Sequence, residues 1–114
     1  MSSPLTTHVL DTSLGRPAHG VPVRLELRAG DGAFREVGRG TTNADGRVTD
    51  LLAPGALERG VYRITFDLDG YFTAGGRAGF YPEASILFRV DAPAEHHHVP
   101  LLLSPFGYTT YRGS

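Results

Sequence analysis

The sequence predicts an all-β fold, a sandwich or a barrel, because its dominant hydrophobic period is two. In residues 21–28, apolar side chains take every odd position and polar ones every even position after Pro22. This pattern is typical of a strand buried on one face. Runs rich in Gly, Asn, Asp and Pro at residues 14–17, 29–33 and 43–46 supply turns between strands. Short strands separated by turns at this spacing are typical of a sandwich or a barrel.

The other expected strands share the same alternation, and one segment interrupts it. In residues 98–103, for example, Val99, Leu101 and Leu103 lie on one side of the expected strand and His98 on the other. Residues 69–75 break the alternation and predict a single short helix. The strands expected beside 21–28 are residues 6–12, 47–51, 62–68, 85–90 and 98–103.

Length and composition exclude several classes of function. A chain of 114 residues is the size of one domain, here residues 1–114, and leaves little surface for a deep pocket, so an enzyme site would have to be shared between subunits. A net charge of −1 gives no footprint for nucleic acid or an anionic membrane. The absence of cysteine and lysine excludes disulfides, thiolate nucleophiles and Schiff-base chemistry. Without a signal or membrane-spanning segment, we expect a soluble, cytoplasmic protein.

Histidine is the most suggestive residue type, with five in the chain and three in a row at residues 96–98. On a strand, His96 and His98 project from the same face and His97 from the other. Metal binding is one interpretation of such a pair, although no motif supplies further ligands. A solvated polar face of a strand is the other. Taken alone, His8 and Arg47 indicate nothing beyond surface positions.

Several motifs follow one another in order along the chain: THVLDT at residues 7–12, GRPA at 15–18, NADGR at 43–47, FYPE at 80–83, HHHVPLLLSPFGY at 96–108 and YRGS at 111–114. Together they resemble the motifs of one family, the transthyretin-related 5-hydroxyisourate hydrolases. Two departures are mild: His97 stands where an aromatic residue, usually tyrosine, is common in that family, and Phe106 replaces another frequent tyrosine.

The resemblance implies a transthyretin-like (prealbumin-like) β-sandwich of two four-stranded sheets with one short helix. It implies a hydrolase of urate degradation, in purine metabolism, that opens the six-membered ring of 5-hydroxyisourate to give 2-oxo-4-hydroxy-4-carboxy-5-ureidoimidazoline. The family uses neither a metal nor a cofactor. It forms homotetramers whose active sites lie at the dimer–dimer interface, so this size of chain is sufficient for an enzyme.

The resemblance also assigns residues to the reaction. His8, Arg47 and His98 match the family's catalytic positions. An imidazole has a pKa suited to activating water, and a guanidinium can stabilise the oxyanion that forms. We expect His8 and His98 to act together on the water, and the choice of base between them stays open. His8 and Arg47, with Tyr111 and Ser114, are expected to bind substrate, and Tyr108, Arg112 and Gly113 to support the site.

Three alternatives make different predictions. Transthyretin itself is a carrier of hydrophobic hormones, but it lacks the two histidines, the arginine and the YRGS ending that this chain has. A β-sandwich accessory or adhesion domain has no reason to end in a packed motif. A metal-dependent hydrolase would lose its activity when a chelator is added.

Overall fold

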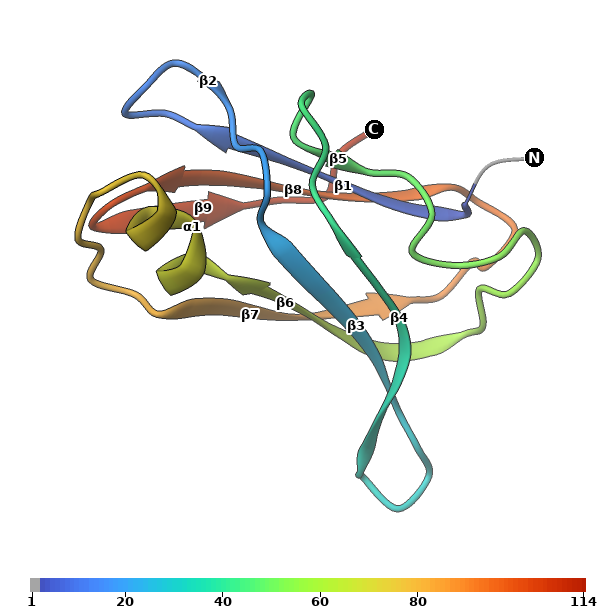
Figure 1. Ribbon diagram of the computed structural model, residues 1–114. Coiled ribbons are helices and arrows are strands. Elements are labelled where there is room, and N and C mark those ends of the chain that lie inside the picture. Colours follow the sequence, from blue (N-terminus) through green and yellow to red (C-terminus); the bar gives the residue numbers. More distant parts are fainter. Residues whose placement is uncertain (1–2) are drawn as a thin grey trace.

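Two β-sheets packed face to face form the molecule, with one short helix at one end (Figure 1). The computed structural model describes residues 3–114. The first sheet, here the β3 sheet, is wholly antiparallel and has the order β4 (Phe34–Thr41), β3 (Pro22–Arg28), β6 (Gly60–Asp67) and β7 (Glu83–Val90). The second, the β1 sheet, has the order β2 (Arg16–Pro17), β1 (Leu5–Asp11), β8 (His97–Ser104) and β9 (Gly107–Thr110), with β5 (Arg47–Val48) also paired to β1.

The expected sandwich and its one helix are confirmed, and the β1 sheet refines the expected strand count. Beyond β1, the place of a fourth strand is shared by β2 and β5, each only two residues long. The β1 sheet therefore contains five strands by count but four positions across. Strands β1 and β8 pair in parallel along residues 5–11 and 97–103, which fixes the register at the centre of this sheet.

Strands β2, β4 and β9 were not among the expected ones, and β2 occupies the second half of the turn expected at residues 14–17. β4 lacks a clean alternation because it is an edge strand with side chains exposed on both faces. Two of its residues are glycines for a steric reason: a Cβ on Gly38 would overlap the Leu51 carbonyl, and one on Gly40 would lie 2.6 Å from Val48 Cγ1. The segment that follows β5 therefore lies directly against β4, and β5 itself ends at Val48.

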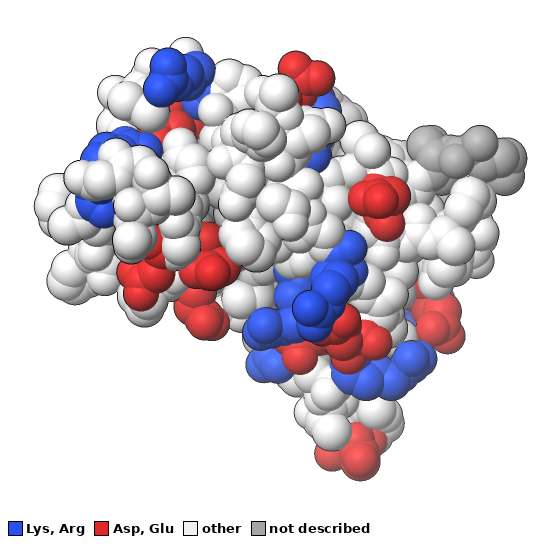
Figure 2. Space-filling model, in the orientation of Figure 1, with Lys and Arg blue, Asp and Glu red and all other residues white. Residues whose placement is uncertain are grey.

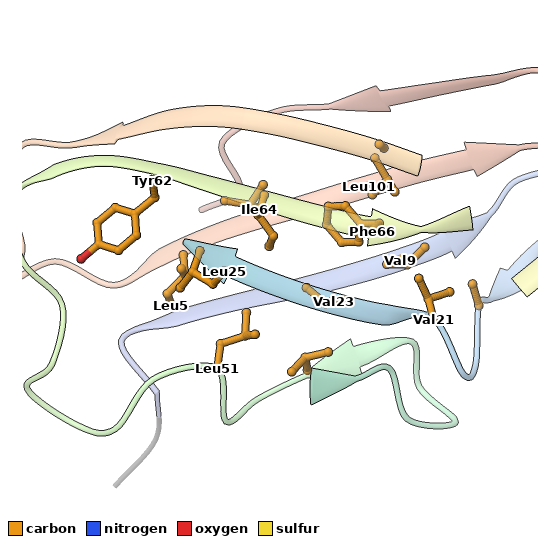
Figure 3. Close-up of a cluster of buried hydrophobic side chains, with 14 of the residues drawn as sticks. Leu5, Val9, Val21, Val23, Leu25, Leu51, Tyr62, Ile64, Phe66 and Leu101 are labelled. Atoms are coloured by element: carbon orange, nitrogen blue, oxygen red, sulfur yellow. The ribbon is translucent and has the colours of Figure 1, made fainter. Parts of the chain in front are cut away.

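The core lies between the two sheets (Figure 3). Inward positions of β1 supply Leu5 and Val9, and inward positions of β6 supply Ile64 and Phe66, all fully buried. Burial of each such side chain contributes about 1.5–3 kcal/mol relative to exposure. The alternation that predicted the strands thus accounts for the sandwich, because one face of each sheet is apolar and can be buried only against the other.

Helix α1 (Leu68–Ala74) is fixed to the start of the chain by a buried carboxylate. The Asp67 side chain caps the helix by accepting from the Gly70 N–H. Asp11, at the end of β1, accepts from Tyr71 Oη at 2.7 Å and from an Arg77 guanidinium nitrogen at 2.7 Å. Among residues 3–114 there is no helix of the length and apolarity needed to cross a membrane.

Candidate active site

Three strands of the β1 sheet bring the two histidines and the arginine to its outer face. Residues of β1 alternate strictly between buried and half-buried, so His8 points away from the core. Arg47 of β5 lies directly opposite His8 across the antiparallel pair. On the neighbouring strand β8, Pro100 pairs with His8. His98 precedes Pro100 by two residues, and its side chain also points outward. Opposed residues on one face of a sheet have Cβ atoms about 5 Å apart.

The turn before β5 explains why Arg47 reaches this face. The Asn43 side chain accepts hydrogen bonds from the backbone N–H groups of Asp45 and Arg47, at 2.9 and 3.0 Å. Gly46 adopts a φ of 75°, and a Cβ there would lie 2.4 Å from the Val9 carbonyl oxygen. Only glycine fits both constraints. The NADG turn therefore fixes the register in which Arg47 faces His8.

Thr6 joins two of the three consecutive histidines. His96 Nε2 and His98 Nδ1 each lie 2.9 Å from Thr6 Oγ1. We define the histidine face as Thr6, His8, Arg47, His96 and His98. The expected common side for His96 and His98 is confirmed, but their nitrogens converge on a hydroxyl. Within residues 3–114, no group of three or more potential ligands could hold a metal ion.

His97 points to the opposite side of β8, as the alternation predicts. Its side chain is buried, and its Nδ1 lies 2.9 Å from the Glu95 carbonyl oxygen. Imidazole here fills an interior position. His97 therefore contributes to packing and lies away from the histidine face.

The C-terminal segment returns to the site and lies along His98. The Gly113 N–H donates to the His98 carbonyl at 2.8 Å, and a Cβ on Gly113 would lie only 2.6 Å from His98 Cδ2. Arg112 of this segment also forms an exposed ion pair of 3.1 Å with Glu95. Tyr111 and Ser114 are exposed there. The segment can therefore line a bound molecule at the histidine face.

Tyr108 is the one expected site residue that lies apart from the others. Tyr108 lies on the edge strand β9 and pairs with Leu103 of β8. Leu103 is five residues along β8 from His98, a distance of about 16 Å. Its ring packs edge-on against Tyr81, with centroids 5.3 Å apart. Tyr108 thus belongs to an aromatic cluster with Phe80 and Tyr81.

Electrostatics favour a neutral imidazole beside a fixed positive charge. Burial lowers the pKa of His98 below its ordinary value of 6.5, and the charge of Arg47 lowers it further. Smaller effects in the same direction come from His8 and His96, whereas a hydrogen bond to the Thr6 backbone acts against them. No carboxylate within the described chain forms an ion pair with Arg47. A neutral base and an unpaired guanidinium are what addition of water to a carbonyl requires.

The histidine face is open in a single protomer. The larger hollows of the described surface lie elsewhere: one of about 660 Å³ between the β1–β2 turn and α1, and one of about 430 Å³ on the outer face of the β3 sheet. Neither is lined by His8, Arg47 or His98. A smaller apolar cleft of about 250 Å³ lies between β7 and β8, and His98, Tyr111 and Arg112 are among the residues that line it.

Comparison with known proteins decides the family. The sequence model of a protein family described as "HIUase/Transthyretin family" matches residues 5–113 of this chain. The chain belongs to this family. Its relatives include a 5-hydroxyisourate hydrolase of Mus musculus, 46% identical over 114 residues, which are 99% of this chain and 97% of that protein.

Two solved structures of the HIUase/Transthyretin family confirm the transthyretin-like fold. The 5-hydroxyisourate hydrolase of Klebsiella pneumoniae matches with a TM-score of 0.85 and 35% identity, over 96% of this chain and 97% of that one. Sea bream transthyretin in complex with thyroxine matches with a TM-score of 0.91 and 34% identity, over 97% and 95%. The resemblance carried by the motifs is thereby confirmed.

Sequence reasoning missed one residue of the site, Thr6, and one contact of Gly113. Thr6 belongs to none of the matched motifs, and its importance follows from the parallel pairing of β1 with β8, which the sequence of neither segment indicates. Gly113 was expected to support the site as part of the YRGS motif, but its close approach to His98 follows only from the fold.

Proposed function

We propose that this chain hydrolyses 5-hydroxyisourate, with His8, Arg47 and His98 performing the reaction. The observation that carries the proposal is the convergence, on one sheet face, of an unpaired guanidinium and an imidazole whose pKa is lowered. Relatives named 5-hydroxyisourate hydrolase, 46% identical in mouse and 42% in Salmonella typhi, support the same substrate.

In this mechanism His98 is the base. Its Nδ1 is engaged by Thr6, so Nε2 is the nitrogen available to a water molecule. Nε2 takes a proton as the water oxygen bonds to the ring carbonyl carbon, and His8 orients that water. The guanidinium of Arg47 donates to the oxyanion that forms. The carbon–nitrogen bond of the ring then breaks, and the nitrogen receives the proton back from His98.

The groups of this mechanism are all side chains, so we propose that it needs no metal and no cofactor. Arg47 and His8 also bind the planar, polar substrate, and Tyr111 and Ser114 position it from the C-terminal segment. Arg112 and Gly113 hold that segment against β8, through the ion pair to Glu95 and the contact with His98. Tyr108 supports the site from a distance, through the aromatic cluster.

We further propose that residues 1–114 form one domain that works as a homotetramer, with each site at a dimer–dimer interface. An open histidine face supports this, because a substrate there needs a second surface to exclude water. Large apolar side chains stand exposed: Phe80 is 68% exposed, Leu87 59% and Phe106 74%. Exposed groups of this size are typical of protein interfaces. Sedimentation at assay concentration tests the assembly, and a fully active monomer contradicts it.

The direct test uses 5-hydroxyisourate generated from urate by urate oxidase. Its decay, followed by ultraviolet absorbance, should accelerate in proportion to the concentration of this protein. A chelator should leave the acceleration unchanged. Decay at the uncatalysed rate would contradict the proposal, and thyroxine binding in its place would favour a carrier like the sea bream relative.

A further inference from the structure

One hydroxyl group holds two imidazoles on the histidine face, and its proton can serve only one of them. Thr6 Oγ1 lies 2.9 Å from His96 Nε2 and 2.9 Å from His98 Nδ1. A hydroxyl donates once and accepts from elsewhere. Thr6 therefore donates to at most one of the two histidines and accepts an N–H from at least one of them. Whether it donates to His98 or accepts from His98 decides the tautomer of His98.

The chemistry of the reaction selects one direction. If Thr6 donates to His98 Nδ1, the proton of neutral His98 sits on Nε2, and that nitrogen cannot take another from water. If Thr6 donates to His96 Nε2, it accepts Nδ1–H from His98, and Nε2 of His98 carries the lone pair. The second direction also suits the imidazolium that forms during the reaction, because its Nδ1–H keeps the same acceptor.

We propose that Thr6 and His96 are positioning residues for the base: His96 accepts the Thr6 proton, and Thr6 accepts Nδ1–H from His98, which leaves His98 Nε2 free toward the substrate. This inference rests on the proposed role of His98. Neither residue touches the reacting atoms. His96 is exposed, so its Nδ1 can exchange protons with solvent while its Nε2 holds the hydroxyl.

The surroundings of His98 make this support necessary. Its charged and titratable neighbours on the adjoining strands are Arg47 and His8, with His96 on its own chain segment and the Glu95–Arg112 pair beyond the C-terminal segment. Burial and the charges of Arg47, His8 and His96 disfavour a positive charge on His98, and a hydrogen bond to the Thr6 backbone favours it. Gly113 covers His98 Cδ2 from the other side. The imidazole is therefore held on two sides.

A matched pair of variants tests the hydroxyl. Thr6→Val keeps the shape and strand preference of the residue but removes the hydroxyl, and Thr6→Ser keeps the hydroxyl. We expect Thr6→Val to lower kcat by about tenfold with little change in KM, and to move the acid limb of the pH–rate profile to lower pH, because the imidazolium loses its acceptor. Thr6→Ser should restore both. Thr109→Val, which removes an exposed hydroxyl from β9, should match the unmodified protein.

A second pair tests His96. His96→Gln keeps an oxygen that can accept from Thr6, whereas His96→Leu keeps none. We expect His96→Leu to lower kcat by about fivefold and His96→Gln to retain most of it. Circular dichroism and thermal melting of each variant verify that the fold is intact.

Nitrogen-15 spectra of the histidine rings give a readout that does not depend on activity. The His98 signals, assigned by their loss in His98→Asn, should show the Nδ1–H tautomer in the unmodified protein and in Thr6→Ser. In Thr6→Val the preference should weaken. Unchanged kcat and an unchanged tautomer in Thr6→Val would overturn the inference. If His98→Asn itself retained full activity, the proposed role of His98 would fail first.

Discussion

The outer faces of the two sheets use arginine in opposite ways. On the β3 sheet, Arg63 pairs with Glu26 at 2.9 Å, and Arg39 pairs with Glu36 at 2.6 Å. Figure 2 shows charged side chains of both signs gathered over β3 and β4. On the β1 sheet, Arg47 forms no ion pair with any described carboxylate and faces two histidines.

The difference shows where charge is available for chemistry. Hydrogen bonding to Arg63 lowers the pKa of Glu26, so the two charges satisfy one another. Such pairs near a surface add little to stability. The charge of Arg47 instead acts on His98 and lowers its pKa. An unpaired guanidinium beside a histidine is therefore a stronger sign of a site than the number of charged residues on a face.

The largest effect should come from the base. His98→Asn removes the proton acceptor, and we expect kcat/KM for 5-hydroxyisourate to fall by at least about a hundredfold, with the thermal melting temperature preserved. We expect His8→Asn to lower kcat/KM by a similar factor. Initial rates of substrate decay measure both. Near-normal turnover in either variant would remove that residue from the mechanism.

A buried pair of charges should matter for stability instead. Asp11 is fully buried, and although burial alone would raise the pKa of this carboxyl, hydrogen bonds from Ser13, Arg77 and Tyr71 lower it from 3.8 to about 2. Because the pKa of Asp11 is lower in the folded protein than in the unfolded chain, its carboxylate stabilises the fold fully above about pH 5. This stabilisation is lost as pH falls toward 2. The loss amounts to about 2 kcal/mol of unfolding free energy.

Denaturant unfolding between pH 5 and pH 2 measures this contribution. Asp11→Asn should be less stable than the unmodified protein at pH 7 and should show a flatter dependence on pH in the acid range. An equal acid dependence in both proteins would assign the acid sensitivity to other carboxylates.

A smaller effect on activity should follow from Gly113→Ala. The new methyl group would lie 2.6 Å from His98 Cδ2, so either the imidazole or the C-terminal segment must move. We expect kcat/KM to fall by about tenfold, since catalytic geometry tolerates little displacement. Gly107→Ala is the matched control, because a Cβ there meets only Ser104 Oγ at 3.7 Å. Equal rates for the two variants would contradict the contact.

The smallest effect should come from the paired face. Arg63→Gln breaks the ion pair with Glu26, which keeps Arg24 at 3.6 Å as a second partner. We expect a loss of less than about 1 kcal/mol in unfolding free energy and a kcat/KM within about twofold of the unmodified protein. Urea unfolding and the decay assay measure the two quantities. A large loss of activity would show that this face also takes part in the reaction.

Much of the fold could be predicted from the sequence because the strands with one buried face have a clear period of two. The segments around Val23, Ile64 and Leu101 are of this kind. The edge strands β4 and β9 were not predicted, because exposure on both faces removes the alternation of apolar and polar residues. Strand β2 has two residues, too few to show any period, and the strand expected at residues 47–51 ends at Val48.

The site divides in a similar way. His8, Arg47 and His98 could be predicted because they stand in motifs that resemble those of a known family. Their convergence could not be derived from periodicity, since it depends on β1 pairing with β5 and β8, which are distant in sequence. Thr6 could not be predicted for the same reason: its partners lie 90 and 92 residues away.

The proposed role of Arg47 is tested by kcat/KM for 5-hydroxyisourate in Arg47→Gln and in Arg63→Gln, measured side by side by substrate decay. Each variant replaces one arginine on the outer face of one sheet. We expect a loss of at least about a hundredfold in Arg47→Gln and near-normal activity in Arg63→Gln. Equal activities in the two variants would show that Arg47 has no special role in the reaction.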